Sequence, residues 1–332
     1  MRLLVLGGTS FVGRAVVEDA VARGWRVTTF NRGRGGWAHP AAERILGDRL
    51  APATLAPLAA RDWDLVLDTW SGAPRAARDA ARLLAPRAAH CTYVSSCSVY
   101  APPPRVGLDE RDPTVDASPD AEDGDYAACK RGAELAIEAA FGDRALVLRP
   151  GLVLGPHEDV GRLPWWLLRI ARGGEVLAPG PAGQPLQLID ARDLARFALD
   201  AAAAGRAGAF NTVSRRGHAT MGTLLEAARA ATGSDATLTW ATPRQIADAG
   251  VEPWTELPIW LPPDHEYRAM HAADVEKAHA AGLSTRPVAA TVADTWAWLE
   301  EVHRDPPLRA DLPAPGLDPT REQALLFALR TA

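Results

Sequence analysis

Apolar residues in the first half of the chain gather in short runs, and stretches with helical spacing separate these runs. The run Leu3-Leu4-Val5-Leu6 is apolar at successive positions, which is typical of a strand covered on both faces. Such runs alternating with helices indicate βαβ units, so the pattern predicts an α/β fold with a parallel sheet. The expected strands are Arg2–Leu6, Arg26–Phe30, Glu43–Leu46, Leu65–Asp68, His90–Val94 and Ala145–Leu148, and the expected helices are Phe11–Arg23, Pro74–Leu84 and Tyr126–Phe141.

The pattern changes after Pro150, where a Trp- and Leu-rich helix and a Gly/Pro turn region fill 156–185. We therefore expect a first domain over residues 1–155, to which 186–215 returns, and a smaller second domain over 156–185 and 216–304. Residues 305–332 are predicted to form a Pro-rich tail with a terminal helix. The other expected elements are helices over Ile189–Ala204, Thr220–Thr232, Val288–Val302 and Pro319–Arg330 and a strand over Ala209–Val213.

The composition is that of an ordinary globular protein of about two domains. The 332 residues are 47% hydrophobic and 23% charged, with a mean hydropathy of −0.11 and a formal net charge of −5. The arginines are interleaved with acids and form no basic tail, which argues against nucleic acid as the main partner. We expect a small-molecule substrate instead.

The cysteines and the N-terminal residues bear on location. Cys91, Cys97 and Cys129 are an odd, sparse set without metal-ligand spacing, which favours a reducing, cytoplasmic setting. The acidic residues Asp109 and Glu110 have no partner histidines nearby in the sequence, so no metal is expected. The four-residue apolar run at the N-terminus is too short for a signal peptide or a membrane helix, so no membrane association is expected.

A glycine-containing turn follows the first expected strand and opens the first expected helix. Its residues are Gly7-Gly8-Thr9-Ser10-Phe11-Val12-Gly13. Glycines let backbone N–H groups approach phosphates, and a helix N-terminus adds partial positive charge, so the segment predicts a site for a dinucleotide pyrophosphate.

The end of the second expected strand bears on the choice of dinucleotide. NAD sites usually place an acid here for the ribose 2′-OH, whereas arginine accommodates a 2′-phosphate. The residues present are Asn31, Arg32 and Arg34. NADP is therefore the preferred cofactor, with NAD as the alternative.

Tyr126 and Lys130 are four residues apart at the start of an expected helix, which places them on one helix face. The chain has only two lysines, Lys130 and Lys277, among 36 basic residues, so the pairing is informative. An ammonium beside the phenol favours the phenolate and brings the pKa of Tyr126 toward the working range of an acid–base catalyst. Upstream, Ser95-Ser96-Cys97-Ser98-Val99-Tyr100 follows an expected strand at the sheet edge where chemistry gathers.

Together these segments, with Arg149-Pro150-Gly151 and Asp190-Ala191-Arg192-Asp193, resemble the extended short-chain dehydrogenase/reductases, an NAD-dependent epimerase/dehydratase-like family. The resemblance implies a Rossmann-type, doubly wound parallel sheet and a smaller, mostly C-terminal substrate domain. It also implies a catalytic triad of Ser96, Tyr126 and Lys130. Tyr126 would exchange a proton with the substrate oxygen, Lys130 would also hold the nicotinamide ribose, and Ser96 would hydrogen-bond the substrate. The further cofactor contacts that it implies are Asp48, Arg49, Thr69, Trp70, Ser71, Pro150 and Val153.

The chain departs from the family pattern in three places. Ser10 replaces the middle glycine of the phosphate turn, Asn31 stands where an acid is expected, and 156–185 contains no convincing nucleotide-sugar clamp. The candidate substrate contacts are Ser98, His157, Trp165 and Trp166, with Trp254 and Trp260 as further members of an aromatic wall that would otherwise be core packing.

Three functions are compatible with these observations. The first is an NADP(H)-preferring oxidoreductase that interconverts a carbonyl and an alcohol on a small organic substrate. The second is an epimerase or dehydratase with an internally recycled cofactor. The third is a non-catalytic nucleotide-sensing or RNA-binding relative, which the intact Ser–Tyr–Lys set and the negative net charge disfavour. The oligomeric state stays open, and a homodimer is compatible with the resemblance.

Overall fold

The computed structural model describes residues 1–34 and 36–331, and it divides into two compact units. The first unit comprises Met1–Gly151, Ala191–Val213 and Asp274–Ser284. The second comprises Leu152–Asp190, Ser214–Ala273 and Thr285–Ala332.

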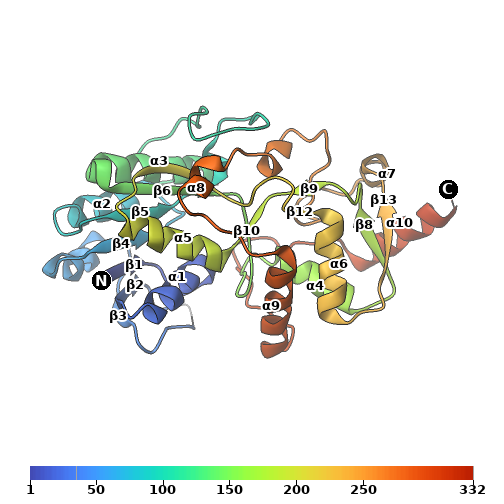
Figure 1. Ribbon diagram of the computed structural model, residues 1–332, viewed down its shortest axis with the longest axis horizontal. Helices are drawn as coiled ribbons and strands as arrows, with labels where there is room; N and C mark the ends of the chain where they lie inside the picture. The colour runs from blue at the N-terminus through green and yellow to red at the C-terminus, as the bar shows by residue number, and fades with distance from the viewer. Residues whose placement is uncertain (35, 332) are drawn as a thin grey trace. The chain divides into compact units, whose positions relative to one another are not determined.

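The first unit is built on a seven-stranded parallel sheet with the order β11-β6-β5-β4-β1-β2-β3 (Figure 1). Its strands are β1 (Arg2–Leu6), β2 (Arg26–Asn31), β3 (Glu43–Leu46), β4 (Leu65–Asp68), β5 (Cys91–Val94), β6 (Ala145–Pro150) and β11 (Gly208–Thr212). Every pairing is parallel. The order runs outward in both directions from β1, which confirms the expected Rossmann-type, doubly wound sheet.

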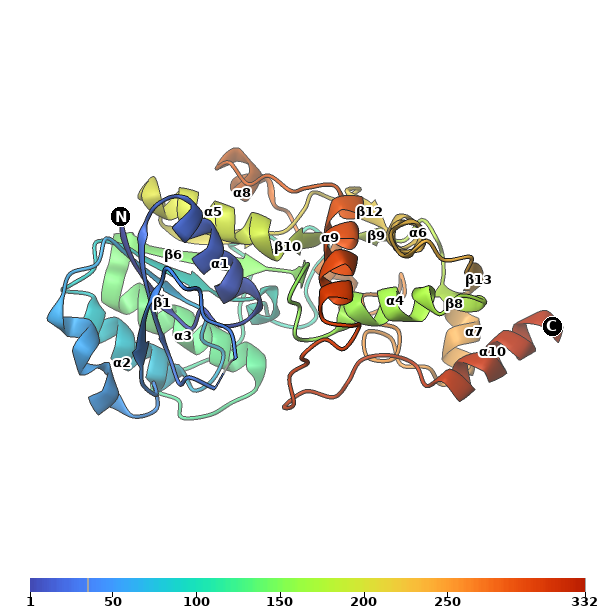
Figure 2. The same ribbon diagram turned by 90° about the horizontal axis from the view of Figure 1, so that it is seen from below.

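Helices cover both faces of this sheet (Figure 2). Helices α1 (Phe11–Ala22) and α5 (Ala191–Ala203) pack together on one face, and α2 (Pro74–Leu84) and α3 (Tyr126–Phe141) pack together on the other. The continuous apolar runs are explained by this double covering, because both faces of each central strand are buried. Leu3, Leu4 and Val5, for example, have no exposed surface.

The strand order reverses between β1 and β4, which are neighbours in the sheet. Parallel strands that run in the same direction bring their C-terminal loops to one edge. The glycine turn after β1 and the Thr69–Ser71 loop after β4 therefore lie next to each other, at the point where doubly wound sheets bind ligands.

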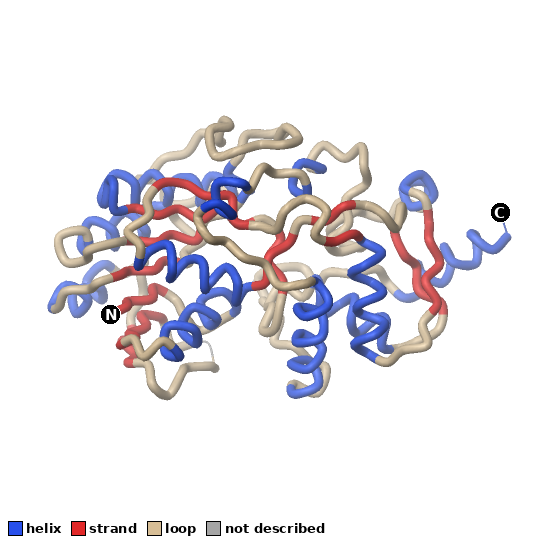
Figure 3. Tube along the Cα trace, viewed as in Figure 1, coloured by secondary structure: helices blue, strands red, loops and turns tan. Residues whose placement is uncertain are grey.

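The second unit packs three helices, α4 (Arg162–Ala171), α6 (Met221–Thr232) and α9 (Val288–Glu301), against one another. A parallel pair of strands, β8 (Glu175–Pro179) and β13 (Thr237–Ala241), packs beside α10 (Pro319–Thr331) (Figure 3). It also contains β7 (Leu152–Leu154), which pairs with β10 (Leu188–Asp190), β9 (Pro185–Leu186), which pairs with β12 (Ala219–Thr220), and the short helix α7 (Pro243–Asp248).

Several segments differ from the sequence-based expectation, among them residues 152–155 and 186–190, which belong to the second unit rather than to the first. Ile189 and Asp190 end strand β10, so the helix expected from Ile189 begins only at Ala191. Asp274–Ser284, including α8 (Glu276–Ala280), belongs to the first unit rather than to a substrate domain. The terminal helix α10 is part of the second unit, because Leu325 and Leu326 enter its core.

None of the described helices is both long enough and apolar enough to cross a lipid bilayer.

Candidate active site

The glycine turn after β1 is tightly packed against its neighbours. Gly7 has φ +124°, and a Cβ placed there would lie 2.5 Å from Thr69 Oγ1. A Cβ on Gly13 would lie 2.8 Å from the backbone nitrogen of Gly8. Both positions thus require glycine, since a side chain would separate the turn from the loop after β4 or from its own first residues.

Helix α1 begins directly after this turn. Ser10 is the N-cap residue, with an extended backbone (φ −140°), and Phe11 takes the unusual φ of +32°. Thr9, Phe11 and Val12 are half-buried around the helix end. Backbone N–H donors at a helix N-terminus, approached closely through glycines, fit the pyrophosphate of a dinucleotide. The residues expected to hold the pyrophosphate therefore lie together.

At the end of β2, the Asn31 side chain is held by hydrogen bonds to backbone groups. Its Nδ2 donates to the Gly7 carbonyl at 3.4 Å, and its Oδ1 accepts from the Gly33 backbone nitrogen at 3.0 Å. Arg32 and Arg34 follow and are exposed. The strand end thus presents a neutral amide and two guanidinium groups, a combination that suits a 2′-phosphate better than a carboxylate would.

One aromatic side chain near this strand end was missed by the sequence analysis. The guanidinium of Arg14 on α1 lies 4.4 Å from the centre of the Trp37 ring. This cation–π contact fastens the β2–β3 connection to the first turns of α1. A tryptophan in an irregular segment gives no periodic signal, so the sequence offered nothing to identify it.

Asp48 and Arg49 follow β3, and the two residues differ in what they contact. Asp48 Oδ1 accepts from the Leu50 backbone nitrogen at 3.0 Å. Arg49 is 6% exposed and bonds both oxygens of Asp68, at 2.5 and 2.8 Å. The Arg49 guanidinium is therefore buried and committed to Asp68, and the contact of this residue with a cofactor stays a prediction.

The Thr69–Ser71 loop continues from β4. Thr69 Oγ1 donates to the Leu6 carbonyl at 3.2 Å, and the indole nitrogen of Trp70 donates to the Ala73 carbonyl at 2.9 Å. Ser71 is exposed. This loop lies beside the glycine turn, as the expected cofactor contacts require.

Tyr126 and Lys130 are brought together by the first turn of α3, which Asp125 caps by accepting from the Ala128 nitrogen at 2.8 Å. The Lys130 Nζ donates to the carbonyls of Trp70 at 2.8 Å and Val94 at 2.7 Å. It lies 6.0 Å from the centre of the Tyr126 ring. Lys130 is 3% exposed, whereas Tyr126 is 51% exposed. A buried ammonium thus lies behind a phenol that solvent can reach.

Ser96 follows β5 and caps the short 3-10 helix Cys97–Val99. Its Oγ accepts from the Ser98 backbone nitrogen at 3.1 Å and donates to Ser98 Oγ at 3.1 Å. Ser96 is 8% exposed, while Ser98 is exposed. Burial raises the pKa of the intervening Cys97 thiol to about 11, so this cysteine stays protonated at neutral pH and is a poor nucleophile.

A buried polar network that the sequence analysis did not predict joins these segments. Arg149 on β6 bonds both oxygens of Glu134 at 2.9 Å and lies 3.2 Å from the Tyr100 hydroxyl. Tyr100 in turn donates to Asn211 Oδ1 at 2.6 Å. Glu134 is one helical turn beyond Lys130, so the network fastens α3 to the segment that carries Ser96. Pro150 ends β6 at the same sheet edge and is buried.

The remaining predicted contacts lie in the second unit, and two of them are core residues. Trp166 is 0% exposed and donates to the Pro258 carbonyl at 2.7 Å, and Trp260 is 1% exposed. The aromatic-wall prediction is wrong for both, because their indoles are enclosed by protein.

Val153, on β7, is half-buried. The other candidates are also half-buried: His157, whose ring lies 5.2 Å from that of Trp298, Trp165, which lies over Gly316, and Trp254, which lies 5.0 Å from the Arg162 guanidinium.

Glu158, the residue after His157, is a buried carboxyl group. It is 0% exposed and accepts from the backbone nitrogens of Arg162 at 2.7 Å and Leu163 at 3.2 Å. Burial raises its pKa to about 7, while Arg162 and the two backbone donors act in the opposite direction. The carboxyl group covers the N-terminus of α4.

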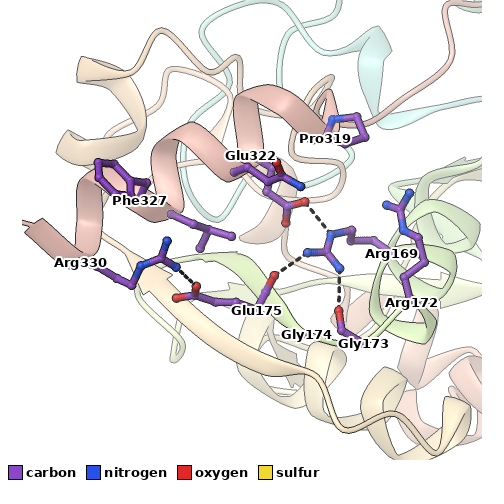
Figure 4. A pocket seen from close by; sticks show the side chains of 11 residues that line it. Arg169, Arg172, Gly173, Gly174, Glu175, Pro319, Glu322, Phe327 and Arg330 are labelled. Atoms are coloured by element: carbon purple, nitrogen blue, oxygen red, sulfur yellow. Dashed lines mark hydrogen bonds and ion pairs between the residues drawn. The ribbon is translucent and has the colours of Figure 1, made fainter.

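A cavity of about 670 Å³ in the second unit lies between α4, β8 and α10 (Figure 4). At its centre Arg169 bonds Glu322 at 2.6 Å and the Glu175 carbonyl at 2.5 Å, and Arg330 bonds the Glu175 carboxylate. These interactions hold α10 against β8. The cavity is therefore a product of how the terminal helix docks.

Over residues 1–34 and 36–331, no three His, Cys, Asp or Glu side chains group as a metal site would require.

Comparison with known proteins agrees with this geometry. Residues 3–213 match the NAD dependent epimerase/dehydratase family. No curated protein sequence matches the chain.

Several solved structures share the fold. UDP-glucose 4-epimerase of Thermotoga maritima with UDP-glucose has a TM-score of 0.66 and 18% identity, covering 91% of this chain and 100% of that one. The Bordetella bronchiseptica enzyme WbmH in complex with NAD⁺ has a TM-score of 0.67 and 16% identity, covering 90% and 98%. UDP-N-acetylglucosamine 4-epimerase of Bacillus cereus has a TM-score of 0.64 and 16% identity, also covering 90% and 98%. At these identities the likeness is one of fold.

Proposed function

Because the chain belongs to the NAD dependent epimerase/dehydratase family, we propose that it is an NADP(H)-preferring oxidoreductase. It would interconvert a carbonyl and an alcohol on a small organic substrate, with Ser96, Tyr126 and Lys130 as the catalytic residues. The observation that carries the proposal is the buried Lys130 ammonium, held by two backbone carbonyls within 6.0 Å of the Tyr126 ring centre.

The proton chemistry follows from the charges around Tyr126. The Lys130 ammonium donates to the neutral carbonyls of Trp70 and Val94 and lies behind the phenol ring. A nearby positive charge stabilises the phenolate and assists proton exchange with a substrate oxygen. Solvent can reach Tyr126, so the proton can be replaced. When bound, the nicotinamide would supply or accept the hydride.

Ser96 is suited to a supporting role. Its hydroxyl is oriented by its two contacts with Ser98, and it lies at the C-terminal edge of the sheet after β5. When the Ser98 hydroxyl instead donates to Ser96 Oγ, the Ser96 hydroxyl can donate a hydrogen bond to a carbonyl oxygen at this edge and hold it for Tyr126. Ser98 is the exposed member of the pair and a candidate to contact the rest of the substrate.

The preference for NADP rests on the end of β2. The neutral amide of Asn31 removes the charge repulsion that an acid there would exert on a 2′-phosphate. Arg32 and Arg34 offer guanidinium partners from the same segment. Titration with NADPH and NADH tests this preference directly.

A second candidate is an epimerase that returns the hydride to the same substrate. Similar folds include UDP-glucose 4-epimerase with UDP-glucose and MoeE5 in complex with UDP-glucose and NAD. Such an enzyme would retain its cofactor and show no net change in the reduced nicotinamide.

The deciding experiment mixes the purified protein with NADPH or NADH and a panel of small aldehydes and ketones, and follows the nicotinamide absorbance. Net oxidation of NADPH supports the proposal. Cofactor that co-purifies, together with epimerised UDP-glucose in the product NMR spectrum and no net oxidation, would replace it with the epimerase. Cofactor binding without turnover on any substrate would contradict both.

A further inference from the structure

The Trp70 backbone connects the predicted catalytic lysine to a buried ion pair. Its nitrogen donates to Asp68 Oδ1 at 2.8 Å. Its carbonyl accepts from Lys130 Nζ at 2.8 Å and from the Tyr93 hydroxyl at 2.9 Å. One peptide segment thus receives the lysine on one side and is anchored to a carboxylate on the other.

The carboxylate that anchors this segment belongs to a buried ion pair. The Arg49 guanidinium bonds both oxygens of Asp68, and the two side chains are 6% and 3% exposed. The same guanidinium lies 4.9 Å from the centre of the Trp70 ring. Arg49 therefore holds the Trp70 segment twice, through Asp68 and through the indole.

Tyr93 lies close to Lys130 and bonds the same backbone carbonyl. It is fully buried on β5, its hydroxyl donates to the Trp70 carbonyl, and the Lys130 Nζ lies 5.0 Å from its ring centre. The ring contact and the shared carbonyl restrict where the flexible lysine side chain can place its charge.

We propose that Arg49, Asp68 and Tyr93 are positioning residues that fix the Lys130 ammonium through the Trp70 carbonyl, and that Arg49 keeps the Asp68 carboxylate from neutralising it. The acid–base role of the lysine rests on the proposed function, but its placement does not. Asp68 is the carboxylate bonded to the same peptide segment as Lys130. With Arg49 in place the Arg49–Asp68 pair is neutral overall, so Asp68 does not cancel the positive charge behind Tyr126.

The charges make opposite predictions for the two members of the pair. Arg49→Met leaves an unpaired Asp68 anion bonded to the peptide segment that holds Lys130, which should raise the pKa of Tyr126 by about one unit. Asp68→Asn removes the anion but keeps a side-chain oxygen for the Trp70 nitrogen, so the pKa of Tyr126 does not rise. Tyr93→Phe keeps the ring and removes one bond to the carbonyl, and should raise the pKa by about half a unit.

The test is an ultraviolet titration of tyrosinate in the full-length protein, taking the difference between each protein and the same protein with Tyr126→Phe. Arg144→Lys is the matched control, since Arg144 bonds the Ala85 and Ala88 carbonyls at the opposite end of the sheet. The titration needs no substrate, so it stays informative if no carbonyl compound is turned over.

The expected order of the Tyr126 pKa is Arg49→Met highest, then Tyr93→Phe, with Asp68→Asn and Arg144→Lys at or below the wild-type value. If Arg49→Met does not fold, Tyr93→Phe and Asp68→Asn decide. A Tyr93→Phe protein that titrates like the wild type, or an Asp68→Asn protein that titrates higher, would overturn the proposal.

Discussion

Two buried arginine–carboxylate pairs with similar chemistry differ in what they hold together. In the first unit, Arg149 pairs with Glu134 at 2.9 Å, at 4% and 0% side-chain exposure. In the second unit, Arg169 pairs with Glu322 at 2.6 Å, at 10% and 5% exposure. The first pair joins the helix of Lys130 to the segment of Ser96, and the second docks a terminal helix.

The difference teaches that burial of a charged pair does not by itself identify a functional site. Both pairs would be costly to break, because removing one partner leaves an uncompensated charge in a dry environment. Only the first pair includes a residue of the helix that carries Tyr126 and Lys130 and also contacts the segment that carries Ser96, through the Tyr100 hydroxyl. Mutations in the two units should therefore separate catalysis from stability.

The largest expected effect is on turnover. Lys130→Met removes the ammonium behind Tyr126, so kcat should fall by about 10²- to 10⁴-fold, the range typical of lost acid–base catalysis. Steady-state kinetics measure the loss, and circular dichroism checks that the variant is folded. A folded Lys130→Met protein with more than a tenth of the wild-type kcat would show that Lys130 is not a catalytic residue.

The second pair should affect stability without affecting chemistry. Arg169→Met leaves Glu322 buried without its cation, which should lower the free energy of unfolding by about 3–5 kcal/mol. Denaturant unfolding measures this, and kcat per folded molecule should be unchanged. The matched change Arg149→Met in the first pair should lower both quantities. Equal losses of kcat in the two variants would show that the pairs do not differ in role.

A pH dependence of stability should arise in the second unit at Glu158. Its pKa is raised from 4.5 to about 7 in the folded protein, so between these values the folded state binds more protons than the unfolded state. Stability from this group is full below about pH 4.5 and is lost as pH rises toward 7, by about 3 kcal/mol in total. Glu158→Gln should flatten the change in unfolding free energy between pH 5 and 8, and an unchanged slope would show that Glu158 is not its source.

The smallest expected effect concerns cofactor choice. Arg32→Ala should weaken NADPH binding about tenfold, because it removes a guanidinium partner of the 2′-phosphate. NADH has no 2′-phosphate, so its binding should be nearly unchanged. Isothermal titration measures the ratio of the dissociation constants for NADPH and NADH. Arg244→Ala, at a solvent-exposed residue of the second unit, is the control. A preference for NADH that Arg32→Ala does not alter would contradict the assignment.

The first unit was more predictable from the sequence than the second for a physical reason. Its central strands are buried on both faces, so Leu3–Leu6 and Leu65–Leu67 are uninterrupted apolar runs in the sequence. The predicted bounds of the strands that contain them, Arg2–Leu6 and Leu65–Asp68, are confirmed. In the second unit, β13 (Thr237–Ala241) is short and only partly buried, and it gives no comparable signal. Its partner β8 is far away in the sequence.

The site shows the same contrast. The Tyr126–Lys130 pairing depends on helical spacing, which the sequence displays, and the structure brings the two side chains to one face of α3. Arg49 could not be read this way, because its partner Asp68 becomes a neighbour only when β4 joins the sheet. Trp166 was likewise hidden, since its burial depends on Pro258, nearly a hundred positions later.

The measurement that tests the central claim most directly compares wild-type protein with Tyr126→Phe. Turnover of a carbonyl substrate with NADPH and the dissociation constant of NADPH are measured on both. Loss of the phenol hydroxyl should reduce kcat at least a hundredfold, while NADPH binding and thermal stability stay near the wild-type values. Near-normal turnover in the Tyr126→Phe protein would contradict the account.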